Sequence, residues 1–289
     1  MWSLPVKPET VMVLGAFFVL LLLENINPLR RPKRCRAPRY LVNLLITALS
    51  FGVGLALVRP VALLGVAAFS ESHAFGLLPW SGLPFALQFV LGFFWMDLTF
   101  YWWHRINHVY PLLWRFHNVH HIDPDMDVST SFRFHFVETL YSTAFRVLQV
   151  GVLGIVPFTY LLYELIFNLC TMFHHSNVRL PLSLEMALNL VMVTPRMHGV
   201  HHSAVGPETN SNYSVIFRWW DLLHRTLRLN VPQNEVVIGV PGYLLPRDNG
   251  PLHLIALPFV RQRPYWRWPS GKASVRQPGG PRDPRVMLA

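Results

Sequence analysis

The chain alternates long apolar runs with short polar and basic stretches. The run at 11–23 is almost purely apolar, a second run covers 40–69, and a third covers 85–103. Arg59 and Pro60 interrupt the second run, which therefore predicts one long helix and a shorter interfacial piece. A helix needs about 20 apolar residues to cross a bilayer. The pattern therefore predicts membrane-spanning helices, and no small-residue cleavage site follows the first run to remove it.

The apolar stretch at 136–173 is long enough for two helices. Gly151, Gly154 and Pro157 lie near its middle and predict a turn. The two arms are therefore expected to form a hairpin of spans or half-spans, which begins and ends on the same side of the membrane. The following stretch, 178–193, is amphipathic and predicts an interfacial segment.

Composition supports an integral membrane protein. The 289 residues are 52% hydrophobic and 14% charged, with a mean hydropathy of +0.31. The net charge is +10, but the basic residues concentrate in connecting stretches and in a Pro-, Gly- and Arg-rich tail from about Arg261, which is predicted to be flexible. The positive-inside rule places the basic stretch 30–39 in the cytoplasm. Two distant cysteines, Cys35 and Cys170, predict neither a disulfide framework nor a cysteine zinc site.

Histidines gather in four groups: HxxxH at 104–108, HxxHH at 117–121 and again at 198–202, and a pair at 174–175. Residues at i, i+3 and i+4 share one helix face, so each group can aim its imidazoles at one point. A lone histidine is usually a hydrogen-bonded core residue, but the repeated motif favours metal ligation. Ten imidazoles exceed the needs of one metal, so a two-metal site is predicted. The candidate ligands are His104, His108, His117, His120, His121, His174, His175, His198, His201 and His202.

Two polar stripes run along apolar helices toward these histidines. Asp97 and Tyr101 precede His104 and His108 at i, i+4, i+7 and i+11. Because a carboxylate inside a span is costly, Asp97 is expected to hold a ligand imidazole by its other N–H, with an interfacial or capping role as an equal alternative.

The second stripe, Glu164, Asn168, Thr171 and His175, has the same spacing. It predicts a lining for the site, although an ordinary helix-packing seam would look similar. His135 fits neither HxxxH nor HxxHH, and Glu138 follows it by three residues. His135 is therefore expected to support the site or the fold rather than to be an extra ligand.

The predicted topology brings the four histidine groups together. The hairpin at 136–173 returns the chain to the cytoplasmic side, where the first two groups also lie. A single span there would have placed 174–202 on the opposite face of the membrane, away from the other groups.

Together, these motifs resemble the fatty acid hydroxylase/sterol desaturase superfamily of membrane di-iron enzymes over about 97–221, a little under half of the chain. The resemblance rests on Asp97 with Tyr101 and Trp102, His104 and His108, the run 113–121, 133–135 with Glu138, 173–177 with Leu180 and Pro181, 194–198 with His201 and His202, Asn212 with Tyr213, and Trp220 with Asp221. The chain departs from the family pattern at Phe136, Ser214 and His224–Arg225, and none of these removes a histidine. In the central pair, His175 matches the family position better than His174, which is often glutamine.

The resemblance implies an all-α integral membrane protein, with about four transmembrane or half-spanning helices carrying a cytosolic histidine-rich di-metal cap. Two iron ions would activate O2 and attack an unactivated C–H bond of a lipid, giving hydroxylation or desaturation. Imidazole also suits zinc, copper and nickel, so the spacing alone does not name iron. The residues expected to support the ligands are Asp97, His135, Glu138, Glu164, Asn177 and Asp221.

No electron-transfer module is visible. The sequence has no GxGxxG motif after a strand, and no histidine accompanies the Pro-Gly-Gly at 278–280 as in a fused b5 domain. An external donor of the ferredoxin or b5 type is therefore expected, and no nucleic acid. The chain is expected to divide into a membrane anchor at 1–83, a catalytic domain at 84–230 and a C-terminal extension at 231–289. The compact loops suit a bacterial inner membrane.

Two other functions are compatible with clustered histidines. A membrane zinc hydrolase would need an open coordination position and a carboxylate base, but no HExxH motif is present. A metal or proton transporter would place its histidines within the spans, whereas these cluster at span ends. The sequence leaves open the lipid, the choice between hydroxylation and desaturation, and the oligomeric state.

Overall fold

The computed structural model describes residues 8–57 and 64–276. Within these ranges the secondary structure is helical, with four isolated β-bridges and no β-strand. The predicted all-α class is therefore confirmed. The interruption expected at Arg59 and Pro60 lies outside the described residues.

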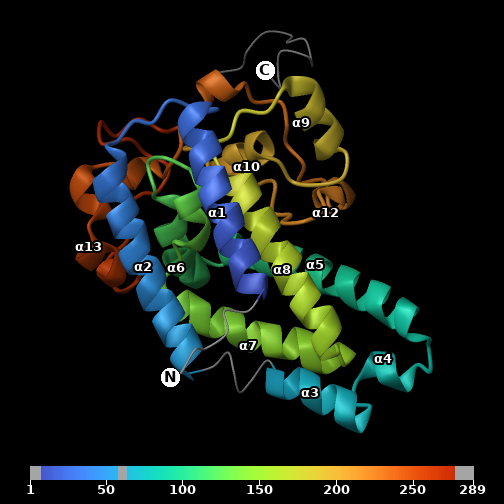
Figure 1. Ribbon diagram of the computed structural model, residues 1–289. Coiled ribbons are helices and arrows are strands. Elements are labelled where there is room, and N and C mark those ends of the chain that lie inside the picture. The colour runs from blue at the N-terminus through green and yellow to red at the C-terminus, as the bar shows by residue number, and fades with distance from the viewer. Residues whose placement is uncertain (1–7, 58–63, 277–289) are drawn as a thin grey trace, which may run out of the picture.

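In Figure 1, the first two helices run from the upper left toward the lower centre of the molecule. Helix α1 is Pro8–Ile26 and α2 is Arg36–Leu57, and the basic stretch connects them. α1 packs against α8 and α2 against α7, two helices defined below. Most apolar side chains of α1, such as Phe18 and Leu22, are exposed. This outward apolar face suits contact with lipid.

The short helices α3 (Leu64–His73) and α4 (Leu77–Trp80) lead to α5 (Phe85–Val109). α5 continues six residues beyond the apolar run, and this extension carries His104 and His108. Tyr110 is extended, and Pro111 begins α6 (Pro111–His121). A proline suits the first turn because its missing N–H would have no helical acceptor there.

A pair of helices joined by a turn follows the 3₁₀ helix η2 (Val128–Phe132), and the turn lies where the sequence predicts it. The two helices are α7 (Phe136–Leu153) and α8 (Pro157–His175), and they diverge from the turn (Figure 1) instead of pairing along their length as a hairpin would. Gly154 ends α7 in the left-handed conformation, with φ of 75°. A Cβ at Gly154 would also overlap the Phe75 carbonyl oxygen, so a glycine is required at this turn.

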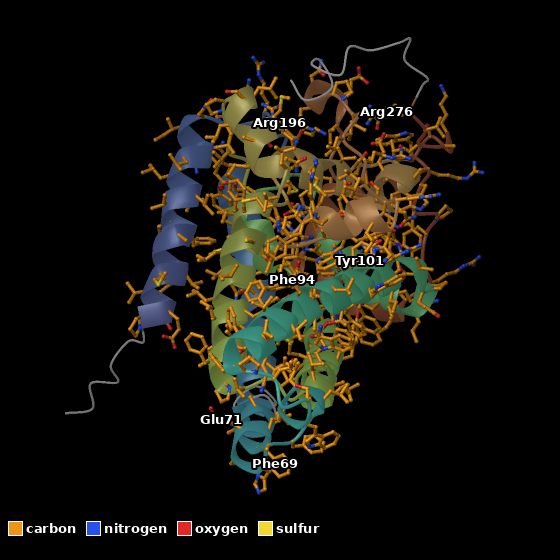
Figure 2. All side chains as sticks on the ribbon, turned by 90° about the vertical axis from the view of Figure 1, so that its right-hand side faces the viewer. Phe69, Glu71, Phe94, Tyr101, Arg196 and Arg276 are labelled. Atoms are coloured by element: carbon orange, nitrogen blue, oxygen red, sulfur yellow. The ribbon has the colours of Figure 1, made fainter. Side chains whose placement is uncertain are left out.

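Short helices and irregular segments form a cap over the ends of α5, α6 and α8. They include α9 (Leu182–Asn189), α10 (Pro195–His201), α11 (Gly206–Thr209), α12 (Trp219–Leu223), η3 (Gln233–Glu235), η4 (Pro241–Tyr243), η5 (Pro246–Asn249), α13 (Pro251–Ala256) and η6 (Leu257–Phe259). Figure 2 shows Arg196 and Arg276 of the cap at the opposite end of the molecule from Phe69 and Glu71.

Part of the tail that was expected to be flexible packs against this cap. Arg276 donates to both carboxylate oxygens of Glu208, and Ser274 is buried. Gly206 of α11 lies against the Trp266 indole, which would crowd a Cβ there. The packed segment therefore extends at least to Arg276, and the rest of the tail lies outside the described residues.

Two apolar clusters hold the histidine-bearing helices in place. One joins Phe93 and Met96 of α5 to Val150 of α7 and Tyr163 of α8. The other packs Trp114, Val119 and Ile122, in and just after α6, against Leu254 and Leu257 of the cap. In the described part of the chain, α1 and α5 are long and apolar enough to cross a membrane. The expected number of four spans stays a prediction.

Candidate metal centre

Nine of the ten candidate histidines form two adjacent sets of buried imidazoles. Within each set, the nitrogens that could bind a metal all lie within 4.8 Å of one another. The first set is His104, His108, His117, His121 and His201. The second set is His120, His175, His198 and His202.

Helix geometry explains how one motif serves both sets. In α6, His117 and His121 are one turn apart and join the first set, whereas His120 points to a neighbouring face and joins the second. The motif that starts in α10 reverses this division, because His198 and His202 join the second set and His201 joins the first. Two copies of HxxHH therefore interlock two sites.

Many of the imidazole nitrogens in the sets have no hydrogen-bond partner among the described residues. Both ring nitrogens of His108, His121 and His202 are buried without a hydrogen bond, as are Nε2 of His117 and of His201. In the second set, the Nε2 atom of His175 lies 3.0 Å from the Nε2 atoms of His120 and His198. Buried polar atoms are nearly always hydrogen-bonded, so this concentration indicates a site for metal ions.

Hydrogen bonds on the far side of the rings fix their orientation. The Nδ1 atom of His104 lies 2.8 Å from the Tyr213 carbonyl oxygen, and that of His201 lies 2.7 Å from the Ser211 carbonyl oxygen. The Nδ1 atom of His175 lies 2.8 Å from the Thr171 carbonyl oxygen. A carbonyl accepts from Nδ1–H and leaves Nε2 unprotonated, which is the state that binds a metal.

The surroundings also keep these rings neutral. Burial, followed by repulsion from neighbouring imidazoles, holds the pKa of His121, His201 and His202 well below the ordinary value. At neutral pH these rings therefore carry a free lone pair without competition from a proton.

His174 lies outside both sets. Its ring centroid is 4.1 Å from that of His198, and it contacts the backbone of Val215. The ring therefore packs beside the second set, whereas His175 directs Nε2 into it. This geometry favours His175 as the ligand of the pair, in line with its better match to the family position.

Glu138 occupies the supporting position that the sequence suggests. Its Oε1 atom lies 2.7 Å from Nδ1 of His117, and both side chains are buried. A carboxylate in this position holds the ring and makes its Nε2 a stronger ligand.

Asp97 is buried, but it does not hold an imidazole as expected. Its Oδ2 atom accepts from the Phe217 amide at 3.2 Å and from the Trp220 indole at 2.7 Å. Asp221 accepts from the amides of Tyr213 and Ser214 at 2.8 and 2.9 Å. Both aspartates thus order the 213–221 loop, which supplies the carbonyl oxygen that faces His104.

The other supporting candidates stabilise the fold around the site. His135 accepts from the Val137 amide at the start of α7, and its Nε2 atom lies 3.1 Å from the Ile255 carbonyl oxygen. Glu164 forms an ion pair with Arg146 at 3.0 Å, so it joins α8 to α7. Asn177 bonds to the backbone of the basic stretch rather than to a histidine.

The sequence reasoning missed the carbonyl oxygens of Thr171, Ser211 and Tyr213. A backbone acceptor can come from any residue type, so only the fold identifies it. A weak signal existed in the polar run 209–213, which lies close after the last histidine motif.

A cavity of about 200 Å³ opens beside both sets. It lies among α2, α5, α7 and α8, and aromatic side chains such as Phe100, Trp103 and Phe167 line it together with hydroxyl and amide groups. Its inner wall is formed by His104, His117, His120, His174, His175 and His198. A molecule entering between the apolar helices would therefore meet the imidazoles at the inner end.

Replacing Glu138 with alanine should weaken metal retention at the first set about tenfold to a hundredfold, because His117 loses its orienting acceptor. Metal release to a chelator, followed by mass spectrometry, measures this change. Glu138→Gln keeps an acceptor oxygen and should recover much of the affinity. Equal loss in the two variants would show that the carboxylate charge matters and the hydrogen bond does not.

The fold and site thus define an all-helical protein with a buried, histidine-rich candidate metal centre. Residues 89–226 match the family described as fatty acid hydroxylase. This match over the central part of the chain agrees with the resemblance that the histidine motifs carry, and the named relatives below support an oxygenase enzyme. No solved structure matches it.

Three relatives illustrate the family. The chain is 29% identical over 259 residues to ornithine lipid hydroxylase OlsE of Rhizobium tropici, and the aligned region covers 87% of this chain and 76% of that protein. It is 29% identical to the alkylglycerol monooxygenase of Danio rerio, covering 80% of this chain and 49% of the relative. Cholesterol 25-hydroxylase of Mus musculus is 31% identical over 46% of this chain and 44% of its own length. The chain thus spans about half of the latter two proteins.

Proposed function

We propose that this protein is an O2-dependent di-iron oxygenase that hydroxylates, or desaturates, an unactivated C–H bond of a membrane lipid. The observation that carries the proposal is the pair of adjacent buried imidazole sets at the inner end of a cavity among apolar helices. Many nitrogens of these sets have no hydrogen-bond partner in the described part of the chain. The named relatives act as lipid hydroxylases or monooxygenases, which favours iron over the other metals that imidazole binds.

The residues present fit two metal ions. Five histidines would hold one ion and four the other, with Glu138 and the three carbonyl oxygens orienting the rings. When bound, the metals supply O2 activation, a chemistry that protein side chains lack. The chain itself would position the lipid C–H bond beside the imidazoles and exclude bulk water through the aromatic cavity wall.

The overall reaction sets the requirement for an electron donor. In hydroxylation, one oxygen atom of O2 enters the C–H bond and the other leaves as water, so two electrons and two protons must be supplied. In desaturation, the lipid loses two hydrogens and O2 leaves as two waters, again with two external electrons. We propose that a ferredoxin or b5-type protein supplies them.

The proposed setting is a membrane, with the metal centre on the cytoplasmic side and, in a bacterium, the inner membrane. The exposed apolar faces of α1 and α2 support insertion. The basic stretch 30–39 joins these helices at their cap ends, which supports a cytoplasmic cap by the positive-inside rule. A lipid substrate could then reach the cavity directly from the bilayer.

Metal analysis of the detergent-purified chain tests this function. After reconstitution with iron, wild type should hold about two irons per chain. With isotopically labelled O2, a reductant and an extracted lipid, it should form a product that carries one labelled oxygen atom if it hydroxylates, or that lacks two hydrogens if it desaturates. His201→Ala should lose the metal of the first set and His120→Ala that of the second, because each removes a ligand from one set.

His73→Ala is the matched control, because His73 is exposed on α3, far from the cap, and its replacement should leave the metal content unchanged. A single zinc per chain, or full metal retention in both the His201→Ala and the His120→Ala variant, would contradict the di-iron site. The zinc hydrolase would then be the better proposal. Metal flux across vesicles without lipid oxidation would favour a transporter instead.

A further inference from the structure

A second cavity, of about 370 Å³, lies between the connection of α1 to α2 and the cap, and its lining is strongly basic. The connection between α1 and α2 forms one wall, and the segments after α6, α8 and η3 form the others. Its basic side chains are Arg30, Arg31, Lys33, Arg36, Arg39 and Arg179. Three acidic side chains also line it, so the lining has an excess of three positive charges.

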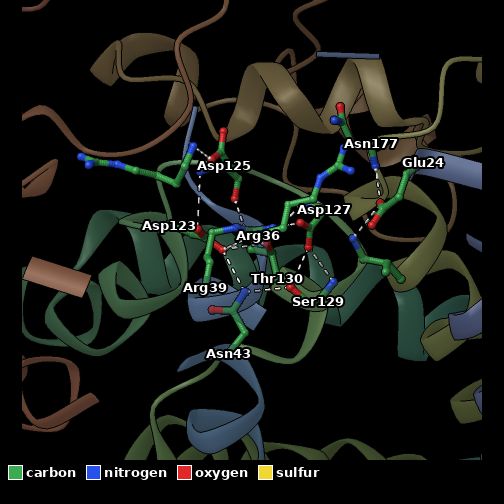
Figure 3. Close-up of polar contacts among 12 residues, drawn as sticks. Glu24, Arg36, Arg39, Asn43, Asp123, Asp125, Asp127, Ser129, Thr130 and Asn177 are labelled. Atoms are coloured by element: carbon green, nitrogen blue, oxygen red, sulfur yellow. Dashed lines mark hydrogen bonds and ion pairs between the residues drawn. The ribbon is translucent and has the colours of Figure 1, made fainter. Parts of the chain in front are cut away.

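The acidic groups of this cavity are already engaged by the protein. Glu24 accepts from the backbone amides of Val128 and Asn177 at 3.1 and 2.9 Å (Figure 3). Asp125 accepts from the backbone amides of Lys33 and Arg34, and Asp127 pairs with Arg39. These carboxylates therefore fix the fold of the cavity wall.

Several basic side chains, by contrast, bond to neutral acceptors. Arg36 donates to the Asn25 side chain, and Arg179 donates to the carbonyl oxygens of Pro28 and Leu29. Arg30 donates through Nη2 to the Pro195 carbonyl oxygen at 2.8 Å and to the Gln233 side chain at 2.9 Å. Their charges thus remain available to an anion.

Arg30 is also short of acceptors. Its Nε and Nη1 atoms are buried and have no hydrogen-bond partner among the described residues. Burial lowers the pKa of Arg30 to about 10, so the group still carries a charge at neutral pH. A buried guanidinium with two unsatisfied nitrogens calls for an acceptor that the described residues do not supply.

The cavity lies where a lipid headgroup would lie in the proposed membrane orientation. It adjoins the last turn of α1 and the first turn of α2. The exposed side chains of Leu22, Leu23 and Ile26 on α1 and of Leu41 and Leu44 on α2 lead away from it along both helices. Acyl chains could follow these faces while the phosphate reaches the arginines.

We propose that this cavity binds a phosphate group, supplied by the headgroup of an anionic phospholipid of the surrounding bilayer. The inference rests on the membrane insertion proposed above but not on oxygen chemistry. A concave site with buried donors fits a compact oxyanion better than it fits the flat, acidic surface of a docked protein.

The same arginine connects the cavity to the metal centre. Besides its bond to Pro195, the Arg30 guanidinium packs so closely on Gly199 of α10 that a Cβ at this glycine would overlap it. The backbone of Arg30 also exchanges two hydrogen bonds with Asn177, two residues after His175. Phosphate binding should therefore stabilise α10 and slow metal release.

Lipid binding to the full metal-loaded chain tests the proposal. Wild type should retain phosphatidylglycerol in native mass spectrometry, and should unfold at a higher temperature in nanodiscs containing it than in phosphatidylcholine alone. The double variant Arg31→Gln/Lys33→Gln should bind phosphatidylglycerol about tenfold or more weakly, because two charges near the phosphate are lost. Both residues are exposed, and neither side chain forms a hydrogen bond or ion pair with another described residue.

The matched control is Arg267→Gln/Lys272→Gln, which removes the same charges from an exposed turn elsewhere on the cap. It should bind phosphatidylglycerol like wild type. Equally weakened phosphatidylglycerol binding in both double variants would contradict a phosphate site in this cavity. Stabilisation of wild type by inorganic phosphate in detergent would support the phosphate chemistry. If inorganic phosphate stabilises the protein and phosphatidylglycerol does not, the lipid assignment is wrong.

A third result would also overturn the proposal. If the double variant binds lipid normally but no longer binds an acidic electron donor, the basic cavity is a protein-docking surface. None of these measurements depends on lipid oxidation, so failure of the proposed enzyme activity would leave the phosphate site intact. Likewise, failure of phosphate binding would leave the proposed enzyme activity untouched.

Discussion

Replacing His175 with glutamine is expected to weaken metal binding at the second set by more than about a hundredfold, whereas His174→Gln should leave both metals in place. His175 directs Nε2 toward His120 and His198, each 3.0 Å away, while Thr171 holds its other nitrogen. Loss of a direct ligand should exceed the tenfold to hundredfold effect of losing a supporting partner.

The two substitutions form a matched pair, because they make the same chemical change at adjacent buried positions of α8. Iron content and the rate of metal release to a chelator measure the difference. A greater loss in His174→Gln than in His175→Gln would show that the end of α8 rotates when metal binds, and that His174 is the ligand. Circular dichroism checks that both variants keep their helices.

Asp123→Asn is expected to lower the free energy of unfolding of the cap by about 3–5 kcal/mol, because it breaks a buried charge network. Asp123 follows α6 by two residues and is fully buried. Its Oδ2 atom lies 2.7 Å from Arg39 and accepts hydrogen bonds from Asn43 and Thr130 (Figure 3). The same atom lies 3.7 Å from Arg133. Without this carboxylate, the buried guanidinium of Arg133 loses a nearby negative charge, and that of Arg39 retains only its ion pair with Asp127.

The contribution of Asp123 to the stability of the fold should also depend on pH. Burial alone would raise the pKa of Asp123, but Arg39 and Arg133 together lower it below the ordinary value. A carboxyl group with a lowered folded-state pKa stabilises the fold at neutral pH, and this contribution is lost as the pH falls through the folded-state pKa. Thermal unfolding of wild type and Asp123→Asn should therefore converge in acid.

Glu71→Gln serves as the control for this prediction, because it removes an exposed carboxylate at the far end of the molecule (Figure 2). Its unfolding temperature should match that of wild type. An Asp123→Asn variant with wild-type stability would mean that the network around Arg39 does not anchor α6 to α2.

Local sequence pattern determined the helical elements and the chemical character of the site. The break at Gly154 and Pro157, the extension of α5 to His108 and the end of α6 at His121 all follow from short-range signals. Such features depend on residues within one or two turns, which the sequence displays directly.

Only the tertiary structure divided the histidines into two sets. The spacing shows that His117, His120 and His121 share a helix face, but their assignment depends on how α6 packs against α5, α8 and α10. Of the two roles considered for Asp97, the structure does not show the bond to an imidazole, because a stripe gives the direction of a side chain and not its neighbour.

The basic stretch shows this limit most clearly. Its charges were readable as a topology signal, yet the bond from Arg30 to Pro195 joins residues 165 positions apart in the sequence. Contacts of this range are set by the packing of whole helices, which no local pattern encodes. The sequence by itself therefore determined which groups could bind metals and anions, while the fold decided which of them meet.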